Sequence, residues 1–428
     1  MTDFMKRFFA VFLALSILCG LAACGKEEVT ELIAPTEEAT PQPMAEAVEP
    51  DPSAEGAIRI YAPGAEAGWT ESAALYTALT GIPAELTDSM DAATLLCVDY
   101  GTMQTLENRA AVLDECAAVS RLTVGAYAYR NAEEHVLGLP LMLESVGVAV
   151  NTELLEKAGY SMERLDGFKA LRRFSTSVND RKDDLGFASW APMALAEGGA
   201  ERLGLFLFDM PIRAELEDFG RFTGKYVGDY NDAHYKDLFT VMLDFGTKTA
   251  GEVNNVTLDE SLSVFAGGGA LFCLVDSGDL GTLAAKGMDL SRLDFVPAWM
   301  FLPNDESWGF ITDATLYAAI CADSEQDRHA AEDFFYWCLT DAAAMEKLSS
   351  VYDGLPYEGF TPGNPMLAKN AANDAAGLSA VPWLHRQISD VNAWNETFLN
   401  GIRTITPDNA VWRWQTMFWV LADLWNAQ

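Results

Sequence analysis

The sequence predicts an α/β fold, in which helices pack over mostly parallel sheets. Apolar runs of strand length occur at residues 58–62, 94–100 and 270–275, and segments with helical caps and glycine stops alternate with them. Half of the residues are apolar, which is typical of a chain that folds around a hydrophobic core. About 370 residues follow an N-terminal stretch of different composition, and that length favours two domains.

Local signals predict the bounds of individual elements. The helix expected at residues 69–80 ends before Gly81, and the helix that begins at Thr152 has this threonine as its cap and Gly159 as its stop. Thr406 and Pro407 predict the start of the last helix. Further helices are expected at residues 107–113, 258–265 and 328–339, and further strands at residues 136–142, 146–150, 295–297 and 315–321.

Charge and motif content exclude several function classes. The formal net charge is −35, and nucleic acid is a poor partner for so acidic a chain because phosphate neutralisation needs clustered lysine and arginine. The summed field favours neutral or cationic ligands. The four histidines are far apart in sequence, and the common metalloprotease, serine-hydrolase and phosphate-loop motifs do not occur. We therefore expect no catalytic residues, no cofactor and no metal site.

The N-terminus carries the signals of secretion. Lys6 and Arg7 precede an apolar run at residues 8–23, which is shorter than the roughly 20 residues that a membrane-spanning helix needs. The run ends in Leu21-Ala22-Ala23-Cys24, which resembles a bacterial lipobox. The resemblance implies that residues 1–23 are a signal peptide and that Cys24 is lipidated. An ordinary secretory signal or a short membrane anchor is the alternative.

Residues 24–57 have the composition of a tether. Between Gly25 and Ala57 there are five prolines and nine acidic residues against one lysine, and there is no aromatic residue. Such a segment buries too little apolar surface to offset its ordering entropy, and its prolines and like charges keep it extended. We expect it to hold a soluble body away from a membrane surface. A tail without a spacing role is the alternative.

Five cysteines remain once the signal peptide and Cys24 are set aside. An odd number in mostly apolar stretches favours buried free thiols over a disulfide framework. A zinc site is not expected either, because the sequence has no Cys-x-x-Cys pair. The five are Cys97, Cys116, Cys273, Cys321 and Cys338.

One segment, residues 138–160, resembles a known protein family. It contains a Leu-Pro turn, then Glu144, then an apolar strand that ends in Asn151, and finally a helix that ends in Lys-Ala-Gly. This order resembles the crossover segment of bacterial extracellular solute-binding proteins, in the carbohydrate-type branch of family 1, although Val150 stands where that family usually has tyrosine. The chain resembles the family in three further motifs, which occur in the family's order at residues 265–271, 330–337 and 355–356.

The resemblance implies a two-lobed periplasmic-binding-protein-like fold of type II, with the lobes joined by hinge crossings. The N-terminal lobe would comprise residues 58–150 and 265–310, and the C-terminal lobe residues 151–264 and 311–428. Hinge closure would capture a small solute, expected to be a sugar or oligosaccharide, for delivery to the permease subunits of an ABC importer. The protein would act as a monomer on the outer face of the cell membrane, attached through its lipid anchor alone.

Glu144 is the first candidate for contact with the solute. It interrupts an apolar run where the family places a ligand-binding polar residue, and a carboxylate accepts two hydroxyls or pairs with an ammonium group. Trp190, at a strand exit, offers a flat indole face for stacking on a sugar or a cation. For every candidate, a solvated turn or core packing is the alternative. The others follow predicted strands or lie in late loops: Glu66, Trp69, Asp99, Tyr100, Asp276, Ser277, Asp279, Trp308, Tyr352 and Tyr357.

Two further function classes remain open at this point. The same fold could bind a cationic solute such as a polyamine, because the acidity and the tryptophans permit it. A cell-surface hydrolase or an interaction protein without a role in import is the third interpretation.

Overall fold

The computed structural model describes residues 57–196, 217–218, 221–222, 241–248, 252–297, 308–381, 391–404, 406 and 409–427. All of them belong to one compact unit, Ala47–Gln428. The expected signal peptide, Cys24 and the tether up to residue 56 lie outside the described residues.

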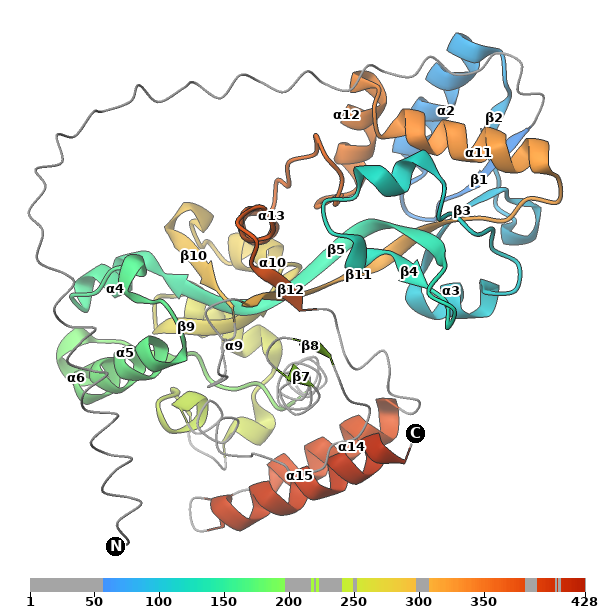
Figure 1. The fold of residues 1–428 in the computed structure, drawn as a ribbon. Helices are drawn as coiled ribbons and strands as arrows, with labels where there is room; N and C mark the ends of the chain where they lie inside the picture. The colour runs from blue at the N-terminus through green and yellow to red at the C-terminus, as the bar shows by residue number, and fades with distance from the viewer. Residues whose placement is uncertain are drawn as a thin grey trace, which may run out of the picture. The chain divides into compact units, whose positions relative to one another are not determined.

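The described strands form one mixed sheet of ten strands and a separate two-stranded sheet (Figure 1). The main path runs in the order β2-β1-β3-β11-β5-β9-β6, with β4 and β10 paired to β5 and β12 paired to β11. The bounds are β1 (Ile58–Tyr61), β2 (Ala84–Leu86), β3 (Leu95–Asp99), β4 (Tyr129–Arg130), β5 (Val136–Asn151), β6 (Ala188–Trp190), β7 (Glu217–Asp218), β8 (Arg221–Phe222), β9 (Ala270–Asp276), β10 (Leu293–Val296), β11 (Trp308–Ile320) and β12 (Ser379–Val381).

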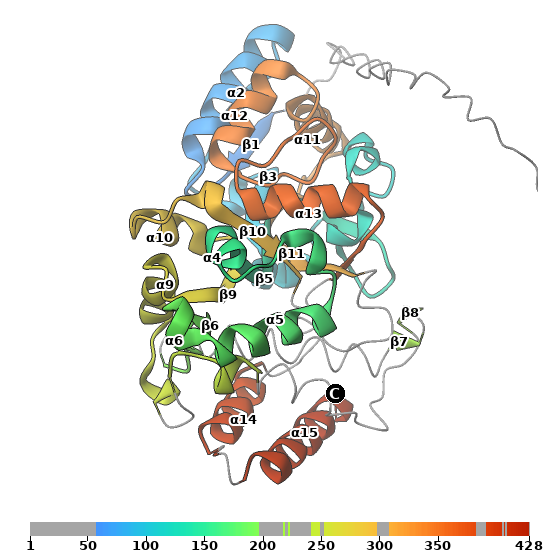
Figure 2. The same cartoon turned by 90° about the vertical axis from the view of Figure 1, so that its left-hand side faces the viewer.

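Helices cover the sheet on both sides, as the α/β prediction requires (Figure 2). Their bounds are α2 (Glu66–Thr80), α3 (Tyr100–Leu106), α4 (Thr152–Lys157), α5 (Phe168–Asp180), α6 (Lys182–Leu185), α9 (Leu258–Ala266), α10 (Asp279–Ala285), α11 (Glu325–Cys338), α12 (Ala342–Val351), α13 (Pro365–Ala375), α14 (Val391–Arg403) and α15 (Ala410–Asn426). Among the described residues, none of these helices is both long enough and apolar enough to cross a membrane.

The two longest strands, β5 and β11, run side by side through the middle of the sheet (Figure 1). The sequence predicted two separate strands at residues 136–142 and 146–150, because Glu144 and Ser145 interrupt the apolar pattern. The structure has one continuous strand, since these two polar residues pair with Asp313 and Thr312 of β11. The expectation of mostly parallel pairing is also corrected: β5 is antiparallel to β4, β9, β10 and β11.

Hydrophobic packing divides along β5 and β11. One group of clusters, here called the β1 half, joins residues 58–143 with residues 314–357 and with Leu367. The other, the β9 half, joins residues 146–196 with residues 270–296 and with α14 and α15. This packing differs from the predicted lobe ranges, which placed 265–310 with the N-terminal segment and 311–428 with the C-terminal one. The reason is topological: β9 and β10 pair with the last part of β5, whereas β11 returns the chain to β3.

Caps and helix starts shift by a few residues from the sequence prediction. The helix expected at residues 107–113 is instead α3, which begins at Tyr100 because the Asp99 side chain accepts a hydrogen bond from the Thr102 N–H. Asn151, not Thr152, caps α4. The last helix begins at Ala410, after Asn409, and not at Pro407. The expected buried free thiols are confirmed at Cys97, Cys116, Cys273, Cys321 and Cys338.

Gly147 marks the closest approach between β5 and its neighbours. A Cβ atom added there would lie 2.7 Å from Cδ1 of Phe310 and 2.8 Å from the carbonyl oxygen of Val296. We expect Gly147→Ala to lower the free energy of unfolding by about 1–3 kcal/mol, because a ring and a backbone carbonyl must both move. Chemical denaturation measures this loss. The control is Gly281→Ala in α10, where the added Cβ meets nothing within 4 Å. Equal losses in the two variants would contradict the prediction.

Candidate functional site

The middle of the β5–β11 pair, residues 142–146 and 311–316, has two chemically different faces. Residues directly opposite each other in a strand pair share a face, and alternate residues along a strand share one too. Leu143 and Ser145 of β5 lie opposite Ala314 and Thr312 of β11, on what we call the α13 face. Met142 and Glu144 lie opposite Leu316 and Asp313, on the carboxylate face.

The carboxylate face continues onto the neighbouring strands. Asp99 of β3 pairs with Leu316, and Asp276 of β9 pairs with Val146, two residues beyond Glu144. The sheet therefore brings together three residues that the sequence singled out, Glu144, Asp99 and Asp276. Met142 is 38% exposed, so this face is open to solvent beside Glu144, which is itself half-buried.

Glu144 and Asp313 face each other directly across the strand pair. Like charges in this position destabilise a sheet, and the cost falls only when hydrogen-bond donors or cations reach both groups. The backbone N–H of Ala314 supplies one donor, at 2.7 Å from Oδ1 of the buried Asp313. Carboxylate oxygens can accept hydrogen bonds from hydroxyl or ammonium groups of a bound molecule.

Sequence reasoning missed Asp313, although a signal was present. The predicted strand began at Thr315, so the acid lay outside it and was not considered. Residues 308–320 are otherwise almost wholly apolar or small, and a single acid in such a run is the same signal that identified Glu144.

On the α13 face, a chain of hydrogen bonds fastens both strands to helix α13. The Ser145 hydroxyl donates to Oγ1 of Thr312 (2.7 Å), and the Thr312 hydroxyl donates to Oδ1 of Asn370 (3.1 Å). Nδ2 of Asn370 donates to the Tyr127 hydroxyl oxygen (3.1 Å) and to Oδ2 of Asp374 (3.2 Å). The Tyr127 hydroxyl in turn donates to Asp374 (3.3 Å). Four of these five side chains are fully buried, so the chain satisfies polar groups that water does not reach.

Ser277, another predicted candidate, belongs to the same framework and is buried. Its N–H donates to the Ser145 carbonyl (2.8 Å), and its own carbonyl accepts from Nδ2 of Asn364, the cap of α13 (2.8 Å). Asp276 and Asp279 are also buried, and each carboxylate accepts the backbone N–H of the other at 3.0 Å. This reciprocal pair shapes the turn between β9 and α10.

Four aromatic candidates are packed inside the protein, which corrects the expectation that their rings face a solute. The indole N–H of Trp69 donates to the Tyr352 hydroxyl (2.8 Å), and that of Trp190 donates to the Ser175 hydroxyl (3.0 Å). Each ring, including that of Tyr357, lies in a hydrophobic cluster and is at most 4% exposed. Their faces already contact other side chains, as in the core-packing alternative.

The remaining candidates lie at element ends. Glu66 begins α2, and the pKa of its exposed carboxyl is lowered mainly by the Gly64 N–H that donates to it. Because β1 and β3 are parallel, Glu66 and Asp99 follow strands that end at the same edge. Tyr100 packs against Tyr129, with ring centroids 5.4 Å apart. Trp308 begins β11 opposite Ser379, and its side chain lies outside the described part of the structure.

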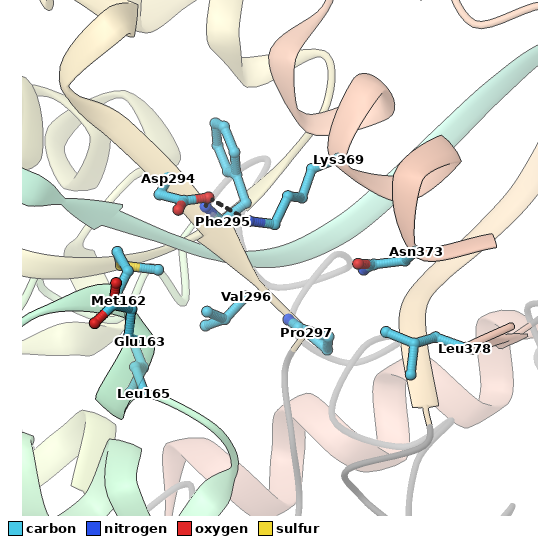
Figure 3. A pocket seen from close by; sticks show the side chains of 10 residues that line it. All are labelled: Met162, Glu163, Leu165, Asp294, Phe295, Val296, Pro297, Lys369, Asn373 and Leu378. Carbon is cyan, nitrogen blue, oxygen red and sulfur yellow. Dashed lines mark hydrogen bonds and ion pairs between the residues drawn. The ribbon is translucent and has the colours of Figure 1, made fainter. Parts of the chain in front are cut away.

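A cavity of about 350 Å³ lies at the outer edge of β10 and was not predicted (Figure 3). Nζ of Lys369 pairs with Oδ1 of Asp294 at 3.0 Å on its wall, and Asn373 of α13 lines it too. Its other walls are largely apolar and come from β10, residues 162–165 and Leu378. Among the described residues, no group of histidine, cysteine and acidic side chains could hold a metal ion.

The fold matches solved structures of solute-binding proteins. The apo form of RafE from Streptococcus pneumoniae matches with a TM-score of 0.66 at 12% identity, over 88% of this chain and 99% of that one. RafE in complex with raffinose matches with a TM-score of 0.53 at 14% identity, over 87% and 99%. The binding protein MsmE of Bacillus subtilis, in an open conformation, gives 0.63 at 13% identity, over 87% and 98%. These likenesses show a two-lobed periplasmic-binding-protein-like fold. No protein-family model and no curated protein matches the sequence.

Asp374 predicts a pH-dependent stability. Burial raises the pKa of this carboxyl from 3.8 to about 6, and its Oδ1 has no hydrogen-bond partner among the described residues. The folded state therefore holds the proton more tightly than the unfolded chain, so the stabilisation is present below pH 3.8 and is lost as the pH rises through 6. We expect Asp374→Asn to be more stable than wild type at pH 7.5, by about 1 kcal/mol after allowing for partial exposure. The gap should close towards pH 4. Thermal unfolding at a series of pH values measures it, and a gap that is constant with pH would contradict the prediction.

Proposed function

We propose that this chain is an extracellular solute-binding protein that captures a sugar or oligosaccharide and delivers it to an ABC importer. Its structural neighbours support the solute class. Besides RafE with raffinose, they include a Bacillus licheniformis sugar transporter in complex with stachyose and a chitin oligosaccharide binding protein. Proteins of this architecture bind and release a solute, so the proposal includes no catalytic step.

The observation that carries the proposal is the pairing of the half-buried Glu144, beside the exposed Met142, with the buried Asp313. It lies where the β5–β11 ribbon passes from the β1 half to the β9 half, and there a solute contacts both halves at once. Neighbouring hydroxyls of a sugar donate hydrogen bonds to such carboxylates, and hydrogen bonds to charged groups are worth about 1.5–3 kcal/mol each. The exposed Asp99 adds an acceptor along the same face.

A comparison of two states of one neighbour supports capture by closure. RafE matches this chain better in its apo form, with a TM-score of 0.66, than in complex with raffinose, with 0.53. The present arrangement is thus nearer to the solute-free form of that protein. A solute shifts the balance towards a closed form only by binding that form more tightly.

The position of the protein in the cell is part of the proposal and rests on the sequence. A signal peptide at residues 1–23, lipidation of Cys24 and an acidic tether would hold the solute-binding unit on the outer face of the cell membrane as a monomer. A permease would then receive the solute there.

A cationic solute such as a polyamine is the second candidate. The carboxylate face supports it, since Glu144, Asp313, Asp99 and Asp276 are all acidic and the chain carries a net charge of −35. Binding of a polyamine would weaken steeply with salt, whereas binding of a neutral sugar would not.

The screen that tests the proposal measures melting temperature and binding heat with raffinose, stachyose, chitin oligosaccharides, galactose and spermidine at low and high salt. We expect one of the saccharides to raise the melting temperature, because a ligand that binds only the folded state stabilises it. A shift with spermidine alone, abolished by salt, would favour the second candidate. No shift with any of these solutes would count against both.

Glu144 gives the residue-level test of the same proposal. Glu144→Gln keeps the shape and removes the charge, so the affinity for the solute found in the screen should fall about ten- to a hundredfold. Glu156→Gln, on the exposed surface of α4, is the matched control and should bind like wild type. Calorimetry measures both, and unchanged affinity in Glu144→Gln would remove this residue from the site.

A further inference from the structure

We propose that Asn370 of α13 is a positioning residue for the solute site, acting through Thr312 and Ser145 on the neighbouring carboxylates. This inference rests on the proposed function. Asn370 does not share a face with Glu144 and Asp313: it lies on the opposite side of the β5–β11 ribbon. It acts by holding the two strands in the register that sets these carboxylates opposite each other.

The alternation of side chains makes this link geometrically direct. Ser145 follows Glu144 in β5, and Thr312 precedes Asp313 in β11, so each hydroxyl is one residue from a carboxylate and points to the other face. Ser145 and Thr312 are themselves cross-strand partners, with their hydroxyl oxygens 2.7 Å apart. A slip of one residue in this pairing would exchange the two faces and remove both carboxylates from the solute side.

The β5–β11 pair needs these additional hydrogen bonds because its backbone pairing is irregular next to Thr312 and Asp313. The register shifts between Ala314 and Leu316, and again between Leu316 and Tyr317. Shifts of this kind disrupt the backbone ladder locally. The buried hydrogen bonds on the α13 face hold the two strands together beside these shifts.

The chemistry at position 370 requires an amide. Oδ1 of Asn370 accepts from Thr312, while Nδ2 donates to Tyr127 and Asp374, so one side chain acts as acceptor and donor at once. Asp cannot donate these bonds and Leu can form none of them. Asn370 is 1% exposed, so each lost bond leaves buried partners without water to replace it.

The N-terminus of helix α13 is anchored by hydrogen bonds and by packing, so the helix can hold Asn370 in a fixed position against the two strands. Its cap, Asn364, accepts the N–H groups of Met366 and Leu367 and donates to the Ser277 carbonyl beyond β9. Met366 and Leu367 then pack into two different hydrophobic clusters, one in each half. The support for the strand register thus comes from the end of β9 and from both cores.

The test removes one hydroxyl without changing shape. Thr312→Val should speed amide hydrogen exchange about tenfold at residues 142–146 and 311–314, and should leave β1 and α9 unchanged. With the solute found in the screen, the affinity of Thr312→Val should fall about tenfold. Thr312→Ser keeps the hydroxyl and should stay within threefold of wild type in both measurements. Asn370→Leu should repeat the effects of Thr312→Val.

Ser175→Ala is the control for a purely structural effect. It removes the buried partner of the Trp190 N–H, away from the strand pair, and should lower stability with no change in affinity or in exchange at residues 142–146. Unchanged exchange in Thr312→Val would overturn the proposal, and so would an equal loss of affinity in Ser175→Ala. The exchange experiment needs no solute. If no solute binds, the proposed function fails, and the exchange result alone decides whether Asn370 sets the strand register.

Discussion

The antiparallel pairing of β5 with β11 is the constraint on which the rest of the structure depends. β5 runs from Val136 to Asn151 and β11 from Trp308 to Ile320, so both strands contribute to the β1 half at one end and to the β9 half at the other. Every other strand of the main sheet joins it through this ribbon or through strands already paired to it. The two halves therefore share backbone hydrogen bonds, which makes any relative motion a bend or twist of the same two strands.

The middle of this ribbon is also the point at which its sequence is least typical of a sheet interior. Glu144, Ser145, Thr312 and Asp313 place polar side chains on both faces of strands that are otherwise apolar. Buried polar groups are tolerated where a network satisfies them, and the hydroxyl pair reaches such a network through Asn370. Replacement of such buried polar groups by hydrophobic residues of similar volume is often neutral or stabilising, so polar residues at this point favour a role other than stability.

The sequence allowed the architecture to be predicted, because strand-length apolar runs, caps and glycine stops are local signals. The starts of the helix at Leu258 and of the strand at Ala270 were predicted to the residue, and each element ends one residue later than predicted. The continuity of β5 was not predictable, because it depends on the tertiary pairing of Glu144 with Asp313, which lies 169 positions later in the chain. The predicted lobe ranges differ from the observed packing for the same reason. The order of strands in the sheet decides which strand pairs with which, and the hydrophobic pattern of the sequence does not reveal that order. Glu144 was singled out because a charge in an apolar run is visible locally. Trp69, Trp190, Tyr352 and Tyr357 were misplaced because an aromatic ring looks the same in sequence whether it meets a core or a ligand.

Burial of these rings changes the chemistry expected at the site. Stacking on sugar faces was expected to come from Trp190, yet its indole packs on Phe272 with centroids 5.3 Å apart. On the described part of the carboxylate face, the proposed recognition would then rest on hydrogen-bond acceptors, with Met142 and Leu316 as the apolar neighbours. Acceptors held on a paired ribbon lose little conformational freedom when a solute binds, which favours affinity. In the proposed function, the same two strands carry the solute-binding groups on one face and the groups that fix their spacing on the other. A change in strand register would then move the carboxylates that contact the solute.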